Sequence, residues 1–258
     1  MKQLRSKLKK IAWLKRLVIS LRLFKNRYSI PHKAILIRSF FKDFKAYKVL
    51  PRNEHWKLQE SDLYPCIYDK TETHTMDPVY FYQDAWCAGK VFANKPVHHW
   101  DIGSQAHMIG IISQFVPTTM IDIRPLTLTS LKNLHFVTGS VLDLPFKDGE
   151  IRSLSSICVL EHIGLGRYGD PIDQFGSEKA FAEMKRVLAP DGDLYISVPV
   201  DAENKVFFNA HRAFTRDYVL ELFKGLMLAE EKYIYGDKIM DLYDAQKGFG
   251  TGLYHFKK

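Results

Sequence analysis

The sequence places polar residues directly after short apolar runs, at spacings that suit a ligand site. Gly103 follows Asp101, and a second acid, Asp122, comes nineteen residues after the glycine. Glycine lets the backbone turn tightly and approach a ligand closely. An acid at about that distance can hold the hydroxyls of a ribose. The glycine and the acid alone are weak evidence for a ligand site. Ser140 and Val141, which follow a third apolar run, strengthen that evidence.

A second group of side chains is suited to proton transfer. Glu161 and His162 are adjacent, so both cannot face one site from regular structure. Histidine is the side chain best tuned for general-base work near neutral pH. His211 and Arg212 follow a later apolar run, and an arginine suits a phosphate or carboxylate on an acceptor. Each histidine also has a structural alternative, as a packed or hydrogen-bonding residue.

A loop rich in glycine spans residues 164–176 and follows the same apolar run as His162. A long polar glycine loop at a ligand-binding edge favours a lid or a substrate determinant over a plain connection. We expect its acceptor contacts to be Arg167, Tyr168 and Asp170.

Short apolar runs alternate with helical periodicity from Val97 onward. Strands alternating with helices predict a parallel α/β sheet with helices on both faces. Ligands on such sheets bind beyond the carboxyl ends of the strands, where the polar residues above fall. The seven expected strands cover residues 97–102, 118–123, 135–138, 153–159, 193–198, 227–235 and 251–256, and the expected helices cover residues 105–115, 177–188 and 215–223.

The net charge of +8 on the 258 residues is concentrated at one end. Residues 1–42 hold 13 Lys or Arg and no acid, whereas the remainder holds 24 basic and 29 acidic side chains. Apolar residues recur every three or four positions between Leu4 and Phe24, which predicts a basic amphipathic helix. Residues 1–28 of such a helix suit an anionic membrane surface; packing on the protein's own domain and a grip on RNA stay open as alternatives.

The predicted organisation has three parts: this basic segment (1–42), an aromatic-rich subdomain (43–96) and the α/β domain (97–258). The α/β domain lacks the basic excess of nucleic-acid-binding proteins, so we expect no DNA partner and regard RNA as a weaker candidate. The spacing of His, Cys, Asp and Glu predicts no metal site. Three scattered cysteines without a C-x-x-C pair indicate a reducing compartment, and we expect a cytoplasmic protein without a signal peptide or membrane span.

Several blocks from Val97 onward together resemble the class I S-adenosylmethionine-dependent methyltransferases of the type-11 kind. Asp101-Ile102-Gly103 resembles the first glycine motif, and Asp122 matches the acid that binds the cofactor's ribose. The other blocks are similar to the family's "LPF-x-D-x-x-F", "vlEHi", "E-x-x-R-V-L-x-P-G-G" and "H-x-r-x-F-T" stretches: Leu144–Ile151, Val159–Ile163, Glu183–Gly192 and His211–Thr215. Two further stretches, Gly164–Pro171 and Phe208–Arg212, resemble a subgroup catalogued as a domain of unknown function.

The resemblance implies a Rossmann-like, seven-stranded sheet that binds S-adenosylmethionine and transfers its methyl group. It implies cofactor contacts from Asp101, Gly103, Ser104, Asp122, Ile123, Ser140 and Val141, and catalytic roles for His162, Glu161 and His211. The acceptor is expected to be a small or membrane-linked molecule, such as a saccharide or a lipid-linked glycan, with Arg212 among its contacts.

The first motif departs from the family, because Gly103 stands alone where two or three glycines are usual. Ser140 also replaces the acid that commonly ends the third strand, and Arg152 stands at the position of the usual Asp after the "LPF" stretch. These departures motivate a second hypothesis, a binding or regulatory protein that keeps the fold without catalysis. A third hypothesis is an RNA methyltransferase that uses residues 1–42 as its RNA grip.

Overall fold

The computed structural model describes residues 30–258 except residues 52, 125 and 129. The chain divides into two compact units, Met1–Thr75 and Met76–Lys258. In the first unit, the described part holds α3 (Ile30–Lys48) and a short 3-10 helix, η1 (Glu60–Asp62). Pro31 lies in the first turn of α3, where a missing backbone N–H breaks no helical hydrogen bond. The expected basic helix between Leu4 and Phe24, and the membrane contact of residues 1–28, lie outside the described residues.

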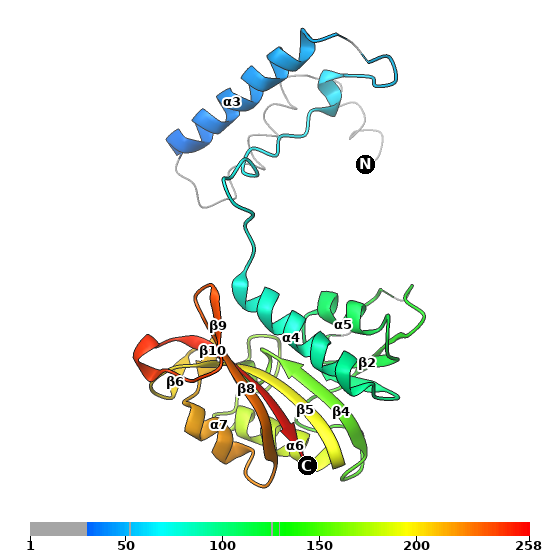
Figure 1. Ribbon diagram of the computed structural model, residues 1–258, viewed down its shortest axis with the longest axis vertical. Helices are drawn as coiled ribbons and strands as arrows, with labels where there is room; N and C mark the ends of the chain where they lie inside the picture. Colours follow the sequence, from blue (N-terminus) through cyan, green and yellow to red (C-terminus); the bar gives the residue numbers. More distant parts are fainter. Residues whose placement is uncertain (1–29, 52, 125, 129) are drawn as a thin grey trace. The chain divides into compact units, whose positions relative to one another are not determined.

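The second unit is built on one eight-stranded sheet with the order β3-β2-β1-β4-β5-β10-β8-β9 (Figure 1). The first five strands of this order run parallel, whereas β10, β8 and β9 pair antiparallel. The strands are β1 (His99–Ile102), β2 (Thr118–Asp122), β3 (Leu134–Thr138), β4 (Ile151–Ile157), β5 (Leu188–Val200), β8 (Met227–Tyr235), β9 (Lys238–Met240) and β10 (Gly250–Lys257).

All seven expected strands are present, and the count of seven is wrong by one. The extra strand, β9, is three residues long and forms a hairpin with β8 across a turn at Gly236, whose φ is +62°. A three-residue strand carries too short a pattern to be read from sequence. A separate two-stranded sheet pairs β6 (Lys205–Phe207) with β7 (His211–Ala213).

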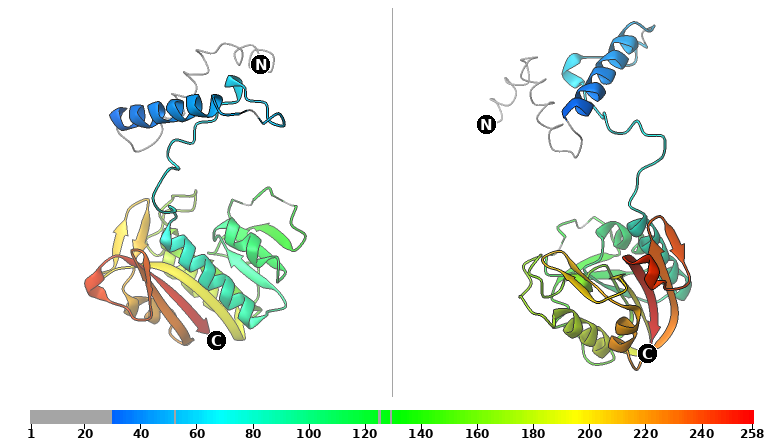
Figure 2. Two further views of the ribbon diagram at one scale, coloured as in Figure 1. Left: turned by 45° about the horizontal axis from the view of Figure 1, so that its top comes forward. Right: turned by 90° about the vertical axis from the view of Figure 1, so that its left-hand side faces the viewer.

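Helices cover both faces of the large sheet, as expected (Figure 2). On one face, α4 (Pro78–Asn94) and α5 (Ala106–Ile112) build a core with Ile157 and Tyr195. On the other face, α6 (Gly176–Val187) and α7 (Arg216–Leu222) pack on the larger core.

The structure places the unit boundary at residue 75 or 76, not at the predicted residue 96 or 97. Asp77 caps α4 by accepting hydrogen bonds from the backbone N–H groups of Val79 and Tyr80. Further along α4, Val91 is fully buried, and the Trp86 Nε1 donates to Glu230 Oε1 on β8 over 2.8 Å. These contacts make α4 part of the sheet's own core rather than of an aromatic subdomain.

We expect Val91→Ala to lower the free energy of unfolding by about 2 kcal/mol, because it removes two methyl groups from a filled core. Val97→Ala is the matched control, since the same change falls on a side chain that is 94% exposed. Urea unfolding of the two variants measures the difference. Equal stabilities would contradict the packing of α4 on the sheet.

Candidate active site

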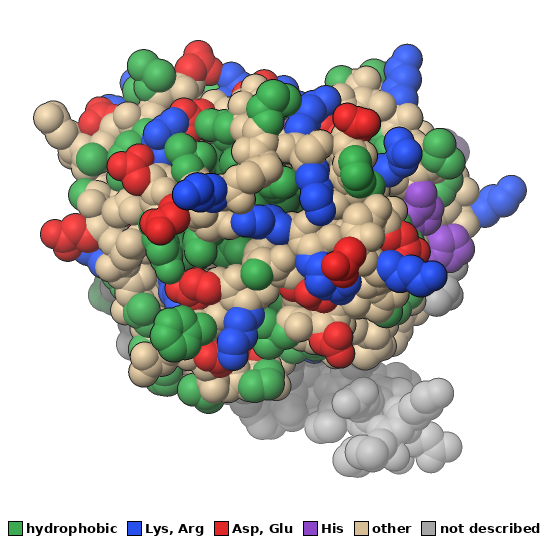
Figure 3. Space-filling model, turned by 90° about the horizontal axis from the view of Figure 1, so that it is seen from below, with side chains coloured by type: hydrophobic (Ala, Val, Ile, Leu, Met, Phe, Trp, Pro, Cys, Tyr) green, Lys and Arg blue, Asp and Glu red, His purple; other side chains and the backbone are tan. Residues whose placement is uncertain are grey.

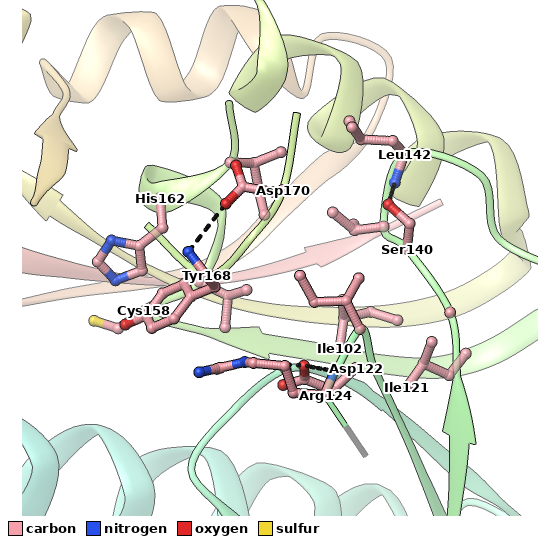
Figure 4. A pocket seen from close by; sticks show the side chains of 16 residues that line it. Ile102, Ile121, Asp122, Arg124, Ser140, Leu142, Cys158, His162, Tyr168 and Asp170 are labelled. Carbon is pink, nitrogen blue, oxygen red and sulfur yellow. Dashed lines mark hydrogen bonds and ion pairs between the residues drawn. The ribbon is translucent and has the colours of Figure 1, made fainter. Parts of the chain in front are cut away.

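A cavity opens beyond the carboxyl ends of β1 to β4 and comprises about 640 Å³ of empty space, including its open mouth (Figure 4). Its walls come from the residues that end each of these strands and from the loop that follows β4. The lining residues are Ile102, Gly103, Ile121, Asp122, Ile123, Arg124, Gly139, Ser140, Val141, Leu142, Cys158, Val159, His162, Ile163, Tyr168 and Asp170. The edge of the sheet predicted from the sequence is therefore where the cavity lies.

Gly103 forms the turn at the end of β1. Its φ of +64° is a backbone conformation that side chains disfavour, and its N–H donates to the Ile121 carbonyl over 2.9 Å. A Cβ at this position would lie 3.1 Å from Val159 Cγ1 and 3.6 Å from Asp122 Oδ2. The missing side chain therefore leaves room for a ligand between β1, β2 and the residues after β4.

Asp122 ends β2 beside this turn, and its side chain is mostly buried. Its Oδ1 accepts a hydrogen bond from the Arg124 backbone N–H over 2.7 Å and lies 3.8 Å from the Arg124 Nε. These contacts orient the carboxylate so that Oδ2 is directed toward the turn at Gly103. A carboxylate oxygen held there can accept hydrogen bonds from a vicinal diol.

Apolar side chains form a slot beside this carboxylate. Ile121 and Ile123 come from β2 and its continuation, and Val141 and Leu142 follow β3. Ser140 Oγ accepts from the Leu142 N–H over 3.2 Å, which fixes the loop after β3. An apolar slot next to an oriented carboxylate fits a nucleoside, with the base in the slot and the ribose on the acid.

Asp101 and Ser104 do not line the cavity. Asp101 is fully buried, and its Oδ1 accepts from the Ser104 N–H over 3.0 Å, while Oδ2 accepts from the hydroxyls of Ser104 and Ser155. Burial raises the pKa of Asp101 to about 6. The structure thus gives these two residues a supporting role, in which they hold the turn that carries Gly103.

His162 lines the cavity from the short 3-10 helix η2 (Leu160–His162) that follows β4. Its Nδ1 donates to the Ala210 carbonyl over 2.6 Å, which leaves Nε2 as the unprotonated nitrogen. Burial is the main cause that lowers the pKa of His162 to about 4. The imidazole is therefore neutral at pH 7 and able to accept a proton or a hydrogen bond.

Glu161 belongs to the same short helix, but its side chain is buried and does not line the cavity. Burial raises the pKa of its carboxyl to about 8, and its Oε1 lies 3.6 Å from His162 Nε2. Of these two adjacent residues, only His162 lines the cavity. At neutral pH this pair is uncharged.

His211 does not line the cavity and lies on β7 among aromatic rings. Its ring centroid is 4.9 Å from that of Phe207 and 5.5 Å from that of Phe249. Burial, and next the charge of Arg167, lower its pKa. These contacts support the structural alternative for His211.

The loop after η2 brings Tyr168 and Asp170 to the cavity, whereas Arg167 lies beside them. The Tyr168 ring has the Arg124 guanidinium 4.1 Å and the Arg167 guanidinium 5.0 Å from its centroid. Asp170 accepts from the backbone N–H groups of Gly164 and Gly166 over 2.7 and 3.3 Å, so its carboxylate shapes the loop. Tyr168 is thus held as one wall of the mouth.

Arg212 is buried and does not line the cavity. It stabilises this loop by hydrogen bonds to its backbone. Its Nη1 donates to the Ile163 carbonyl over 2.6 Å and to Ser177 Oγ over 2.9 Å. Its Nη2 donates to the carbonyls of Asp173 and Gln174 over 3.2 Å each. The guanidinium is used within the fold, which contradicts its predicted role as an acceptor contact.

Three residues at or beside the cavity were missed in the sequence. Arg124 is exposed beyond β2 and belongs to no recognisable motif. Gln83 is buried on α4, which the sequence analysis placed in the aromatic-rich subdomain. Cys158 follows an apolar run, which predicts an inert core position, yet it lines the cavity with a φ of +52°. A cysteine directly before the "vlEHi" block was the available signal.

Within the described residues, no group of three His, Cys, Asp or Glu side chains is arranged to hold a metal ion.

We expect Arg212→Lys to destabilise the protein by about 3 kcal/mol, because an ammonium cannot satisfy the carbonyls that the planar guanidinium reaches. Loop residues 164–176 should at the same time become sensitive to limited proteolysis. If the variant instead matched wild type in its free energy of unfolding and its rate of proteolysis but bound the acceptor more weakly, Arg212 would be an acceptor contact after all.

The raised pKa of Glu161 makes stability depend on pH. The folded carboxyl holds its proton up to about pH 8, whereas the unfolded carboxyl, with a pKa of 4.5, loses it earlier. Because the folded state binds more protons between these values, the contribution of Glu161 falls as pH rises, by at most about 1.4 kcal/mol per pH unit.

Urea unfolding between pH 4.5 and 8 should therefore show a steeper loss of stability in wild type than in Glu161→Gln. The exposed Glu221 on α7 supplies the control, and Glu221→Gln should follow wild type. Parallel profiles for wild type and Glu161→Gln would show that the carboxyl is ionised in the fold.

Comparisons with known proteins bear on the family and on the fold of this chain. The model of a family described as "Caenorhabditis protein of unknown function, DUF268" matches residues 146–237, which is about a third of the chain. No curated protein matches the chain. Within the described residues, no helix is both long and apolar enough to span a membrane.

Solved structures are similar over most of their length. The 1,6-didemethyltoxoflavin-N1-methyltransferase of Burkholderia thailandensis, solved with S-adenosylhomocysteine, is 15% identical, with a TM-score of 0.50 over 91% of this chain and 92% of that one. A candidate sarcosine dimethylglycine methyltransferase from Galdieria sulphuraria is 15% identical, with a TM-score of 0.51 over 72% and 91%. The cyclase SpnF is 13% identical, with a TM-score of 0.51 over 68% and 80%.

Identities this low speak for the fold alone, and the presence of a cyclase among the similar structures shows that the fold does not fix the reaction. The fold is what the sequence blocks and the sheet order also indicate. The chain has the Rossmann-like fold of the class I S-adenosylmethionine-dependent methyltransferases.

Proposed function

We propose that the protein binds S-adenosylmethionine in the cavity beyond β1 to β4 and transfers its methyl group to an acceptor. The observation that carries the proposal is the pairing of the Gly103 turn with Asp122 Oδ2 beside an apolar slot. The diol of the cofactor's ribose would bind Asp122, and its adenine would lie between Ile123 and Val141 near Ser140. The bound cofactor supplies an electrophilic methyl group on a sulfonium.

The protein's own contribution is alignment and exclusion of water. Tyr168 closes one side of the mouth, and the loop that carries it is tied down by Asp170 and Arg212. His162 presents a neutral imidazole to the cavity, so it can bind the acceptor or take a proton from it.

For the acceptor, we propose a small or membrane-linked molecule, such as a saccharide or a lipid-linked glycan. The basic residues 1–28 support a protein held peripherally at the inner face of a membrane, and the scattered cysteines support the cytoplasm. The face seen in Figure 3 mixes Lys and Arg with Asp and Glu, so this face carries no basic patch of the kind that binds nucleic acid.

A second candidate function is a binding protein that keeps the cofactor site without catalysis. The observation that favours it is Ser104, whose side chain is buried behind the turn where the family usually has further glycine. Retention of bound cofactor with no methyl transfer to any acceptor class would support this candidate.

Calorimetric titration with S-adenosylhomocysteine should show micromolar binding that Asp122→Asn weakens at least tenfold, because the neutral amide presents one acceptor in place of two. Asp217→Asn is the control, since this carboxylate lies exposed on α7. NAD should not bind. Folded protein that binds no sulfur ligand would overturn the proposal.

A further inference from the structure

A group of exposed apolar side chains lies at the sheet edge that carries the cavity. It comes from the hairpin of β6 and β7, which follows β5, and from residues 241–249, which precede β10. Gly250 at the start of β10 pairs with Val200 at the end of β5, so both segments meet at this edge, as Figure 1 shows. The five side chains, which we call the apolar patch, are Val206, Phe207, Phe208, Leu242 and Phe249.

Aromatic contacts join the two segments into one surface. The ring centroids of Phe207 and Phe249 are 6.2 Å apart, with the ring planes at 89°, and both rings contact His211. The Tyr243 hydroxyl donates to the Asp201 carbonyl over 2.7 Å, which holds the second segment at the end of β5. The apolar patch is therefore a surface that the fold builds.

The patch is connected to the wall of the cavity through Ala210, at the turn of the hairpin. The Ala210 carbonyl accepts from His162 Nδ1 over 2.6 Å and from Arg167 Nη1 over 3.0 Å. His162 itself lines the cavity. Phe208 lies two residues before Ala210 and is 74% exposed. A molecule in contact with the Phe208 ring is therefore close to the cavity.

The hairpin has the properties of a segment that enters the interface of a bilayer. Residues 205–213 contain no acid, so an anionic surface does not repel them. Residues of β6 and β7 pair at three positions, and the Ala210 N–H donates to the Phe207 carbonyl over 2.8 Å. Unpaired backbone groups are costly in lipid, and these bonds reduce that cost for the turn.

The charge of the chain favours a bilayer over a folded protein as the occupant of the patch. A large exposed apolar patch marks an interaction site with protein or with membrane. Residues 1–42 hold 13 Lys or Arg and no acid. A segment of this charge is attracted to anionic lipid headgroups, and exposed rings in the same chain then add apolar contact with the lipid.

We propose that the apolar patch inserts among the headgroups of an anionic bilayer, led by Phe208, and holds the cavity at the membrane surface. An acceptor anchored in the bilayer then presents its polar group to the cavity without leaving the lipid. This consequence for the acceptor rests on the proposed function, whereas insertion itself is measured without cofactor or acceptor.

The test uses the full chain and vesicles of phosphatidylcholine and phosphatidylglycerol in equal parts. An amino acid with a dansyl group replaces Phe208 in one variant and Phe92 in another. Phe92 is the matched control, because its ring is 60% exposed near the end of α4, shortly before β1 begins at the opposite edge of the sheet. The dansyl emission reports lipid contact at the labelled position, apart from any contact of residues 1–42.

We expect the emission from position 208 to shift to shorter wavelength with vesicles and to be quenched by brominated acyl chains. Position 92 should show neither change. Phe208→Ser should weaken vesicle binding about tenfold in a sedimentation assay, because it removes an apolar ring from the lipid. Phe92→Ser should match wild type, and both serine variants should bind S-adenosylhomocysteine as wild type does.

The other outcomes separate the two proposals. Vesicle binding without a change in emission at position 208 would overturn the inference and leave residues 1–42 as the membrane contact, and absence of vesicle binding would overturn it too. Self-association that Phe208→Ser abolishes, without lipid contact, would make the patch an interface between copies of the chain. Insertion at position 208 by protein that binds no S-adenosylhomocysteine would overturn the proposed function and leave the membrane contact standing.

Discussion

The turn at the end of β1 depends on one buried carboxylate, that of Asp101. It holds the backbone and the hydroxyl of Ser104 and thereby fixes Gly103 at a positive φ. Ser104 Oγ in turn accepts from the Ile157 N–H over 2.9 Å, which ties the turn to β4. The opening for a ligand exists because these bonds hold β1 and β4 in register at their carboxyl ends.

The loop after β4 is organised in the same manner, by buried polar groups that satisfy backbone atoms. Asp170 accepts from the amides of Gly164 and Gly166, and Arg212 donates to the carbonyls of Asp173 and Gln174. Gly164 allows the close approach, since a Cβ there would lie 2.1 Å from the Asp173 carbonyl oxygen. The charged residues Asp170 and Arg212 thus stabilise the backbone of this loop, which forms one wall of the cavity.

Local and periodic features of the sequence predicted the parts of the structure that they encode. The second half of β5 is an apolar run, and Gly103, Asp122 and Ser140 lie at or directly after the ends of short runs, so their meeting at one edge could be predicted. The same features did not predict the roles of Asp101 and Arg212, because a charged side chain looks the same in sequence whether it faces a ligand or a backbone. Only the fold shows which partners are within reach.

The helix α4 was misassigned for a related reason. Its aromatic residues indicated burial, but sequence cannot tell which surface they bury against, and Trp86 pairs with Glu230 at a distance of 144 residues. The contacts of Gln83 with Cys158 and Ser197 could not be foreseen from a helix placed in another domain.

The position of β10 has a consequence for how the protein forms during synthesis. This strand follows β8 and β9 in the chain but lies between β5 and β8 in the sheet, pairing with both. Until residues 250–257 have left the ribosome, the β8–β9 hairpin has no strand that joins it to the parallel half. The edge of β5 is exposed during that interval, so the nascent chain carries an open sheet edge that is protected only when β10 inserts.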